Sequence, residues 1–192
     1  MRLLPPSTDQ VMKKRLLSLI KNIILDRDGV INEVVIRDSK VESPRCLSEY
    51  IIKEDFKRFH ARIKGKDINL FVVSNQPDIA RGKMHESELM EMNNLLLNSY
   101  SFKEIVYCIH DDIDSCDCRK PKPGMIDHLI KTYDLNRSEV IFIGDSWKDM
   151  EAGISAGIKT VFFTQEYNNP DEIKADYFVT SLLELIDLPI WE

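Results

Sequence analysis

The chain has 192 residues, of which 43% are hydrophobic and 30% charged, and its formal net charge is -6. These values are ordinary for a folded soluble domain that buries a core. The acidic balance argues against a general nucleic-acid binder, which needs a basic face to displace counterions, although it leaves room for a small anionic ligand. No apolar run approaches the ~20 residues of a membrane span, and the run after Arg15 is too short for a secretory signal. We therefore expect a cytoplasmic protein, without a nucleic-acid or membrane partner and most simply a monomer.

The first 21 residues precede every strand-like run and form a predicted N-terminal extension. Within it, Ser7, Thr8 and Asp9 are suitable caps for a helix that runs to Ile20. Residues 22–192 are expected to form a single domain.

Short apolar runs rich in Val, Ile and Phe alternate with longer amphipathic segments along this domain. The runs do not alternate polar and apolar residues, which is typical of parallel strands covered on both faces. The predicted strands are Asn22–Leu25, Asn69–Ser74, Glu104–Ile109, Glu139–Gly144, Thr160–Thr164 and a weaker edge strand, Asp176–Thr180. The predicted helices are Leu47–Lys64, Glu86–Tyr100, Gly124–Tyr133 and Ser146–Ala156, the last ended by Gly157, while Arg37–Pro44 is a predicted loop. The alternation predicts a doubly wound, mostly parallel α/β sheet of Rossmann-like type with helices on both faces.

Polar residues follow the strands at the edge where such sheets bind ligands. Asp26 and Asp28 follow the first strand, Ser74 and Asn75 end or follow the second, and Asp145 follows the fourth, with Asp149 four residues on. Each group also has a local interpretation as a turn or a helix cap. An EF-hand is excluded, because a loop counted from Asp26 lacks the required ligands and turn glycine.

Basic residues follow the third strand, where Arg119, Lys120 and Lys122 lie in a Pro-rich turn before a helix. They are either a solvated basic loop or cations that hold a phosphate. Taken together, the strand ends supply a carboxylate nucleophile, an acid or base, cation ligands and donors for phosphoryl oxygens. The combination predicts metal-dependent phosphoryl transfer more strongly than any one motif does.

Three of the four cysteines lie in the stretch CIHDDIDSCDC. With one histidine they make a Cys₃His set, Cys108, His110, Cys116 and Cys118, which is a structural zinc composition. The alternatives are a buried strand cysteine and two exposed loop thiols, and a reducing compartment disfavours disulfides. Four protein ligands leave no open position for a catalytic water, so a zinc ion here would be structural.

The motifs DRDGVIN, SNQPDIARG, CIHDDIDSCDCRKPKPGM and GDSWKDMEAGISAG resemble those of the haloacid-dehalogenase superfamily, and more narrowly its small phosphatases without a large cap domain. The resemblance covers roughly Asn22 to Phe163. It implies that Asp26 attacks phosphorus to form an aspartyl-phosphate, and that Asp28 acts as general acid and base. It also implies a zinc-binding loop at the cysteines. The further implied roles are magnesium held by Asp26, Asp28 (through its backbone carbonyl) and Asp145, and phosphate or substrate held by Ser74, Asn75, Arg119 and Lys120.

The resemblance points to a small phosphorylated metabolite as substrate, with heptose 1,7-bisphosphate (losing its 7-phosphate) ahead of histidinol phosphate. The turn ARG and the motif GDSWKDMEAGISAG are closer to the heptose branch, whereas the five-residue gap between His110 and Cys116 is closer to the histidinol branch. The acidic residues Asp111, Asp112 and Asp114 depart from both, and we expect them to repel a second phosphate. A zinc-stapled binding protein without catalysis is the alternative from another class.

Overall fold

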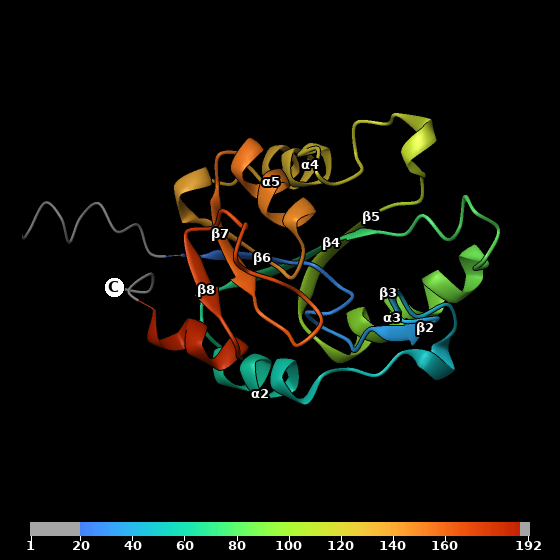
Figure 1. Cartoon of the computed structure of the whole chain (residues 1–192). Helices are drawn as coiled ribbons and strands as arrows, with labels where there is room; N and C mark the ends of the chain where they lie inside the picture. The colour runs from blue at the N-terminus through green and yellow to red at the C-terminus, as the bar shows by residue number, and fades with distance from the viewer. Residues whose placement is uncertain (1–19, 189–192) are drawn as a thin grey trace, which may run out of the picture.

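The computed structural model describes residues 20–188, which form a six-stranded parallel sheet with helices on both faces (Figure 1). The strand order is β5-β4-β1-β6-β7-β8. The strands are β1 (Asn22–Leu25), β4 (Asn69–Asn75), β5 (Phe102–Cys108), β6 (Val140–Gly144), β7 (Lys159–Phe163) and β8 (Tyr177–Val179). All six predicted strands are thus confirmed, and β8 is the edge strand. The predicted helix in the N-terminal extension lies outside the described residues, apart from its last residue, Ile20.

Two helical layers cover the sheet. In Figure 1, α4 (Gly124–Thr132) and α5 (Trp147–Ser155) lie on one face, and α2 (Glu54–Ile63) and α3 (Glu86–Ser99) lie on the other. The described chain also contains four short 3₁₀ segments: Leu47–Glu49, Asp112–Asp114, Arg137–Glu139 and Leu182–Asp187. None of the helices within residues 20–188 is long and apolar enough to cross a membrane.

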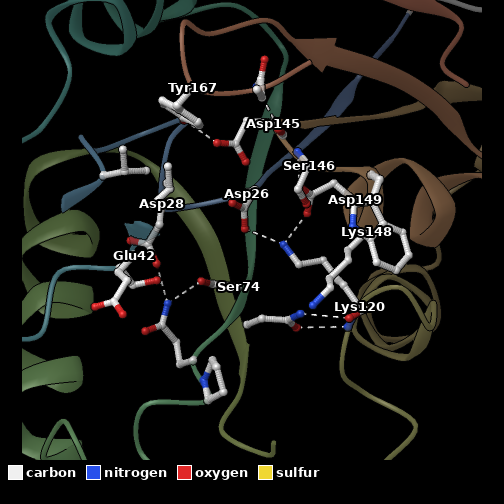
Figure 2. Close-up of a pocket in the computed structure, with 18 of the residues that line it drawn as sticks. Asp26, Asp28, Glu42, Ser74, Lys120, Asp145, Ser146, Lys148, Asp149 and Tyr167 are labelled. Carbon is white, nitrogen blue, oxygen red and sulfur yellow. Dashed lines mark hydrogen bonds and ion pairs between the residues drawn. The ribbon is translucent and has the colours of Figure 1, made fainter. Parts of the chain in front are cut away.

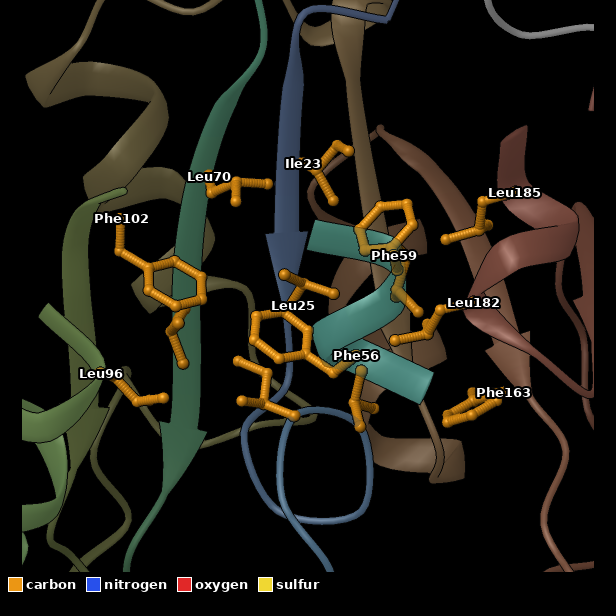
Figure 3. Close-up of a cluster of buried hydrophobic side chains, with 14 of the residues drawn as sticks. Ile23, Leu25, Phe56, Phe59, Leu70, Leu96, Phe102, Phe163, Leu182 and Leu185 are labelled. Atoms are coloured by element: carbon orange, nitrogen blue, oxygen red, sulfur yellow. The ribbon is translucent and has the colours of Figure 1, made fainter. Parts of the chain in front are cut away.

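The central strand β1 shows why three successive apolar residues, Ile23 to Leu25, are needed there. Ile23 and Leu25 pack into the core beneath α2 and α3, whereas Ile24 packs into the second core beneath α4 and α5. Figure 3 shows the first core, where Phe56 and Phe59 of α2 lie against β1. Both phenylalanines are fully buried, and burial of such a side chain contributes about 1.5–3 kcal/mol.

The prediction of one helix over Leu47–Lys64 is wrong. A 3₁₀ turn over Leu47–Glu49 is separated from α2 by extended residues that pair with the loop after β1. There the amide of Lys53 donates to the Ile31 carbonyl at 2.9 Å, and the Glu33 amide donates to the Ile51 carbonyl at 2.8 Å. These tertiary hydrogen bonds override a helical spacing of apolar residues.

The prediction of a loop over Arg37–Pro44 is also wrong. The segment contains most of an antiparallel hairpin, β2 (Val35–Arg37) and β3 (Lys40–Glu42). Its two-residue turn places Asp38 and Ser39 at φ 49° and 61°, the left-handed conformation that tight hairpins require. The helix end predicted at Gly157 is confirmed, since this glycine has φ 67° directly after the cap of α5. Within the described residues this hairpin is the small insertion after β1, and no separate cap domain is present.

Candidate active site

The carboxyl ends of the parallel strands meet at one cavity of about 490 Å³. Its lining brings together seven of the residues predicted from sequence: Asp26, Asp28, Ser74, Asn75, Arg119, Lys120 and Asp145. Figure 2 shows the Lys120 ammonium beside Asp26 and Asp149, with Asp145 next to Asp26 and with Asp28 and Ser74 on the other side of Asp26. The convergence follows from topology, because β1, β4 and β6 are neighbours that all run in the same direction.

Lys120 pairs with two of the carboxylates at the base of the cavity. Its Nζ lies 2.5 Å from Asp26 Oδ1 and 2.6 Å from Asp149 Oδ1, and it also donates to the Val73 carbonyl at 3.1 Å. Burial by itself lowers the pKa of Lys120, but the charges of Asp149 and Asp26 outweigh burial and raise that pKa above its ordinary value. The ammonium is therefore charged at any working pH.

Three buried carboxylates surround this single ammonium. The ligand oxygens of Asp26, Asp145 and Asp149 all lie within 4.8 Å of one another. Burial is the largest influence on Asp26 and Asp145; with repulsion among the carboxylates it raises the pKa of Asp26 well above its usual range and that of Asp145 to about 7. Because negative charge exceeds positive charge in a desolvated space, the donor set fits a hard divalent cation with oxygen ligands.

Asp28 has a different environment, although it is only two residues from Asp26. Its carboxylate accepts from Arg27 Nε (3.0 Å) and Nη2 (3.1 Å), from Asn32 Nδ2 (3.0 Å) and from Gln76 Nε2 (2.7 Å). Burial raises the pKa of Asp28, but the charge of Arg27 and these hydrogen bonds outweigh it and lower that pKa. The group is thus held as a carboxylate in this ligand-free arrangement.

Sequence reasoning missed Gln76, which joins two of the predicted site residues. Its amide nitrogen donates to Asp28 Oδ2 and to Ser74 Oγ, both at 2.7 Å, while its buried Oε1 has no hydrogen-bond partner. Residues two apart on a strand share a face, so Ser74 and Gln76 point into the cavity together. The two-residue period of a strand is therefore the sequence signal that could have identified Gln76. The Asn75 side chain points toward the Lys120 backbone instead. Its Oδ1 accepts from the Lys120 N–H and its Nδ2 donates to the Lys120 carbonyl, both at 3.0 Å.

A loop after β7 supplies a second group that the sequence did not predict. Tyr167 donates its hydroxyl to Asp145 Oδ2 at 2.5 Å, and Asn168 Nδ2 donates to the Asp145 backbone carbonyl at 2.9 Å. Gly29 lies beneath this contact at φ 93°, and a Cβ there would come within 2.0 Å of Asp145 Oδ2. Only glycine permits this close approach. No sequence signal singled out Tyr167, because it is distant in the chain from every motif.

The four predicted zinc ligands form one cluster. The ligand atoms of Cys108, His110, Cys116 and Cys118 lie within 4.8 Å of one another. The Cys108 sulfur lies 3.6 Å from that of Cys116 and 3.2 Å from that of Cys118, and His110 Nδ1 lies 3.3 Å from the Cys118 sulfur. All the cysteines are free, so the cluster is not a disulfide. A set of three sulfurs and one imidazole that face one centre fits a tetrahedral zinc ion.

The acidic loop between His110 and Cys116 is paired with arginines of the cavity wall. Asp111 accepts two hydrogen bonds from Arg81, at 2.6 and 2.7 Å, and Asp112 accepts one from Arg119 Nε at 2.7 Å. Asp114 accepts from the Asp111 backbone N–H at 2.7 Å and thereby shapes the turn. We expected these acids to repel a second phosphate; the structure instead shows Asp111 and Asp112 neutralising two cavity cations.

Comparison with known proteins identifies the family. Residues 117–185 match the family model described as HAD-hydrolase-like. A protein of Campylobacter jejuni named D-glycero-alpha-D-manno-heptose-1,7-bisphosphate 7-phosphatase is 34% identical over 163 residues, which cover 82% of this chain and 88% of that protein. The chain belongs to the haloacid-dehalogenase superfamily, and it is a phosphatase.

Two further relatives agree with this assignment. A Pseudomonas aeruginosa protein named D-glycero-beta-D-manno-heptose-1,7-bisphosphate 7-phosphatase is 37% identical over 136 residues, covering 68% of this chain and 73% of that protein. The crystal structure of D,D-heptose 1,7-bisphosphate phosphatase from B. bronchiseptica, complexed with magnesium and phosphate, superposes with a TM-score of 0.72 at 27% identity. That superposition covers 87% of this chain and 98% of the other. The fold of this haloacid-dehalogenase phosphatase is thus that of a magnesium-complexed relative.

Proposed function

We propose that this phosphatase removes one phosphate from a small sugar phosphate, with the 7-phosphate of heptose 1,7-bisphosphate as its substrate. The observation that carries the proposal is the cluster of Asp26, Asp145 and Asp149 around Lys120 at the end of the cavity where four predicted motifs meet. The relatives named as heptose bisphosphate 7-phosphatases at 34% and 37% identity support the choice of substrate.

Asp26 is the proposed nucleophile. Its carboxylate forms a bond to phosphorus as the bond to the leaving sugar oxygen breaks, and the product is an aspartyl-phosphate. Lys120, which contacts Asp26 Oδ1 at 2.5 Å, and Ser74 are proposed to hold the phosphoryl oxygens. Asp26, Asp145 and the Asp28 backbone carbonyl would hold magnesium, which when bound supplies positive charge against the repulsion between carboxylate and phosphate.

Asp28 is the proposed acid and base. It must carry a proton to release the sugar, whereas the ligand-free arrangement holds it ionised. A phosphate that enters the cavity adds negative charge beside Asp28 and favours its protonated form. After the sugar leaves as an alcohol, the same carboxylate accepts a proton from the water that hydrolyses the aspartyl-phosphate, and the cycle closes.

Zinc is proposed as a structural ion at Cys108, His110, Cys116 and Cys118. This cluster lies directly before Arg119 and Lys120 in the chain, so a zinc ion would hold the loop that carries both. The Asn75 side chain, bonded to both backbone groups of Lys120, fixes the loop from the sheet side. Arg119 is proposed to face the substrate.

The test is a phosphate-release panel with magnesium present. We expect heptose 1,7-bisphosphate to give the highest kcat/KM and to release one phosphate per molecule. Histidinol phosphate is the competing substrate, favoured by the five-residue gap between His110 and Cys116. An Asp26→Asn variant sets the background, because an amide is a poor nucleophile. Turnover of every compound at this background rate would refute the proposal.

A further inference from the structure

Four cations line the active-site cavity, and three of them are already paired with carboxylates: Lys120 with Asp26 and Asp149, Arg81 with Asp111, and Arg119 with Asp112. Lys148 is the fourth, and within the described part of the chain no carboxylate lies within ion-pair distance of its ammonium. Its ammonium lies over the ring of Trp147, whose centroid is 5.7 Å from Nζ. The cavity thus holds one cation whose charge is not neutralised by the protein.

Arg81 and Arg119 line the cavity but are less available than Lys148 to bind an anion. Arg81 uses Nε and Nη2 in a two-pronged pair with Asp111, and its Nη1 lies 3.6 Å from Asp78. Arg119 uses Nε for Asp112 and Nη1 for the His110 carbonyl at 3.3 Å. An anion that recruits either arginine must first break an ion pair, whereas Lys148 only has to lose water.

Lys148 is half-buried, whereas Lys120 at the base of the cavity is fully buried, so Lys148 lies nearer the mouth. The hydrogen bond and charge of Arg119 are the main causes of the lowered pKa of Asp112, and the charge of Lys148 adds to them; the Asp112 side chain is 73% exposed. Figure 2 shows Lys148 on the same side of the cavity as Lys120 and opposite Tyr167. Trp147, which is 49% exposed and lines the same cavity, offers an apolar ring beside this cation.

We propose that Lys148, with Trp147 beside it, is a specificity-determining residue that binds the phosphate remote from the reaction centre. This inference rests on the proposed function, since it requires a substrate with a second anionic group. The reacting phosphate lies at Asp26 and Lys120, the sugar crosses the cavity past Trp147, and the second phosphate meets the unpaired ammonium at the mouth. The acidic zinc loop keeps Arg81 and Arg119 from binding anions indiscriminately.

The experiment compares two substrates that differ only in the second phosphate, heptose 1,7-bisphosphate and heptose 7-phosphate. The readout is the ratio of their kcat/KM values. Lys148→Ala is expected to lower this ratio roughly tenfold, the usual effect of losing one charge-assisted hydrogen bond. Lys131→Ala, an exposed lysine on α4 away from the cavity, is the matched control and is expected to leave the ratio unchanged.

The Asp112→Asn variant distinguishes Lys148 from Arg119 as the residue that binds the second phosphate. Removing this exposed partner frees Arg119 and is expected to raise the ratio by up to about fivefold, since an exposed ion pair is weak. An unchanged ratio in Lys148→Ala overturns the inference, and a rise in Asp112→Asn alongside it reassigns the second phosphate to Arg119. Equal losses on both substrates also overturn it, because Lys148 would then act on the reacting phosphate. If the wild-type protein hydrolyses heptose 7-phosphate but not the bisphosphate, the proposed substrate fails first and the inference fails with it.

Discussion

Replacing Lys120 by Met tests the electrostatic account of the site, because it removes one charge and keeps a similar length of side chain. Lys120 is buried and contacts Asp26 and Asp149 at 2.5 and 2.6 Å. Its loss leaves the carboxylates of Asp26, Asp145 and Asp149 without a counter-charge. Breaking a buried ion pair in this way costs about 3–5 kcal/mol of the free energy of unfolding. For a domain of this size the melting temperature falls by ~2–4 °C per kcal/mol, which predicts a loss of roughly 6–20 °C.

The assay is thermal unfolding at pH 8 and pH 6, first without and then with added magnesium. No chelator is used, because a chelator would also remove zinc. The loss should be larger at pH 8, since protonation of carboxyls whose pKa values are raised relieves the repulsion at pH 6. Magnesium should raise the melting temperature of the variant more than that of the wild-type protein. Lys131→Met is the control, because this exposed lysine lies on α4 away from the cavity, and we expect the free energy of unfolding to change by no more than about 0.5 kcal/mol. A Lys120→Met protein that melts with the wild type at pH 8 would refute the reasoning.

Three further results are expected. We expect roughly one zinc per chain in the wild-type protein, and Cys116→Ser should bind less zinc, melt at a lower temperature and lose activity. Cys46→Ser, outside the cluster, is the control and should match the wild type in metal analysis and unfolding. A normal zinc content in Cys116→Ser would contradict the site. Because the pKa of Asp145 is about 7, that of Asp26 is also raised, and the ion must displace their protons, magnesium affinity measured by calorimetry should fall at least tenfold per pH unit below 7; a flat profile would rule this out. Gln76→Leu, which removes a donor to Asp28, should slow hydrolysis of sugar phosphates more than that of p-nitrophenyl phosphate, whose leaving group needs no proton; equal slowing would argue against a role through Asp28.

Residues that the chain order places at strand ends were predictable. Parallel strands bring their carboxyl ends to one edge, so Asp26, Ser74 and Asp145 meet whatever the details of packing. The cluster of three cysteines and His110 was predictable for a related reason, since its four residues lie within eleven residues of chain and need only a loop to meet. Gln76 shared this strand signal and was overlooked.

Local sequence does not show which residues that are distant in the chain will contact each other in the fold. Apolar spacing predicted one helix over Leu47–Lys64, but hydrogen bonds to the loop after β1 held part of it extended. Tyr167 reaches Asp145 from a loop 22 residues later, and Arg81 reaches Asp111 from 30 residues earlier.

The acidic loop between His110 and Cys116 shows most clearly the difference between what the sequence and the fold determine. Its composition predicted repulsion of a second phosphate, because charges counted along a chain carry no record of what they face. In the folded chain Asp111 faces Arg81 and Asp112 faces Arg119, so the loop neutralises the cavity wall instead of charging it. The sequence by itself determined the chemistry at the base of the site, through motifs that sheet topology gathers in any such fold. The tertiary structure alone decided the electrostatics at its mouth, because Coulomb interactions depend on distances between charges and not on their order in the chain.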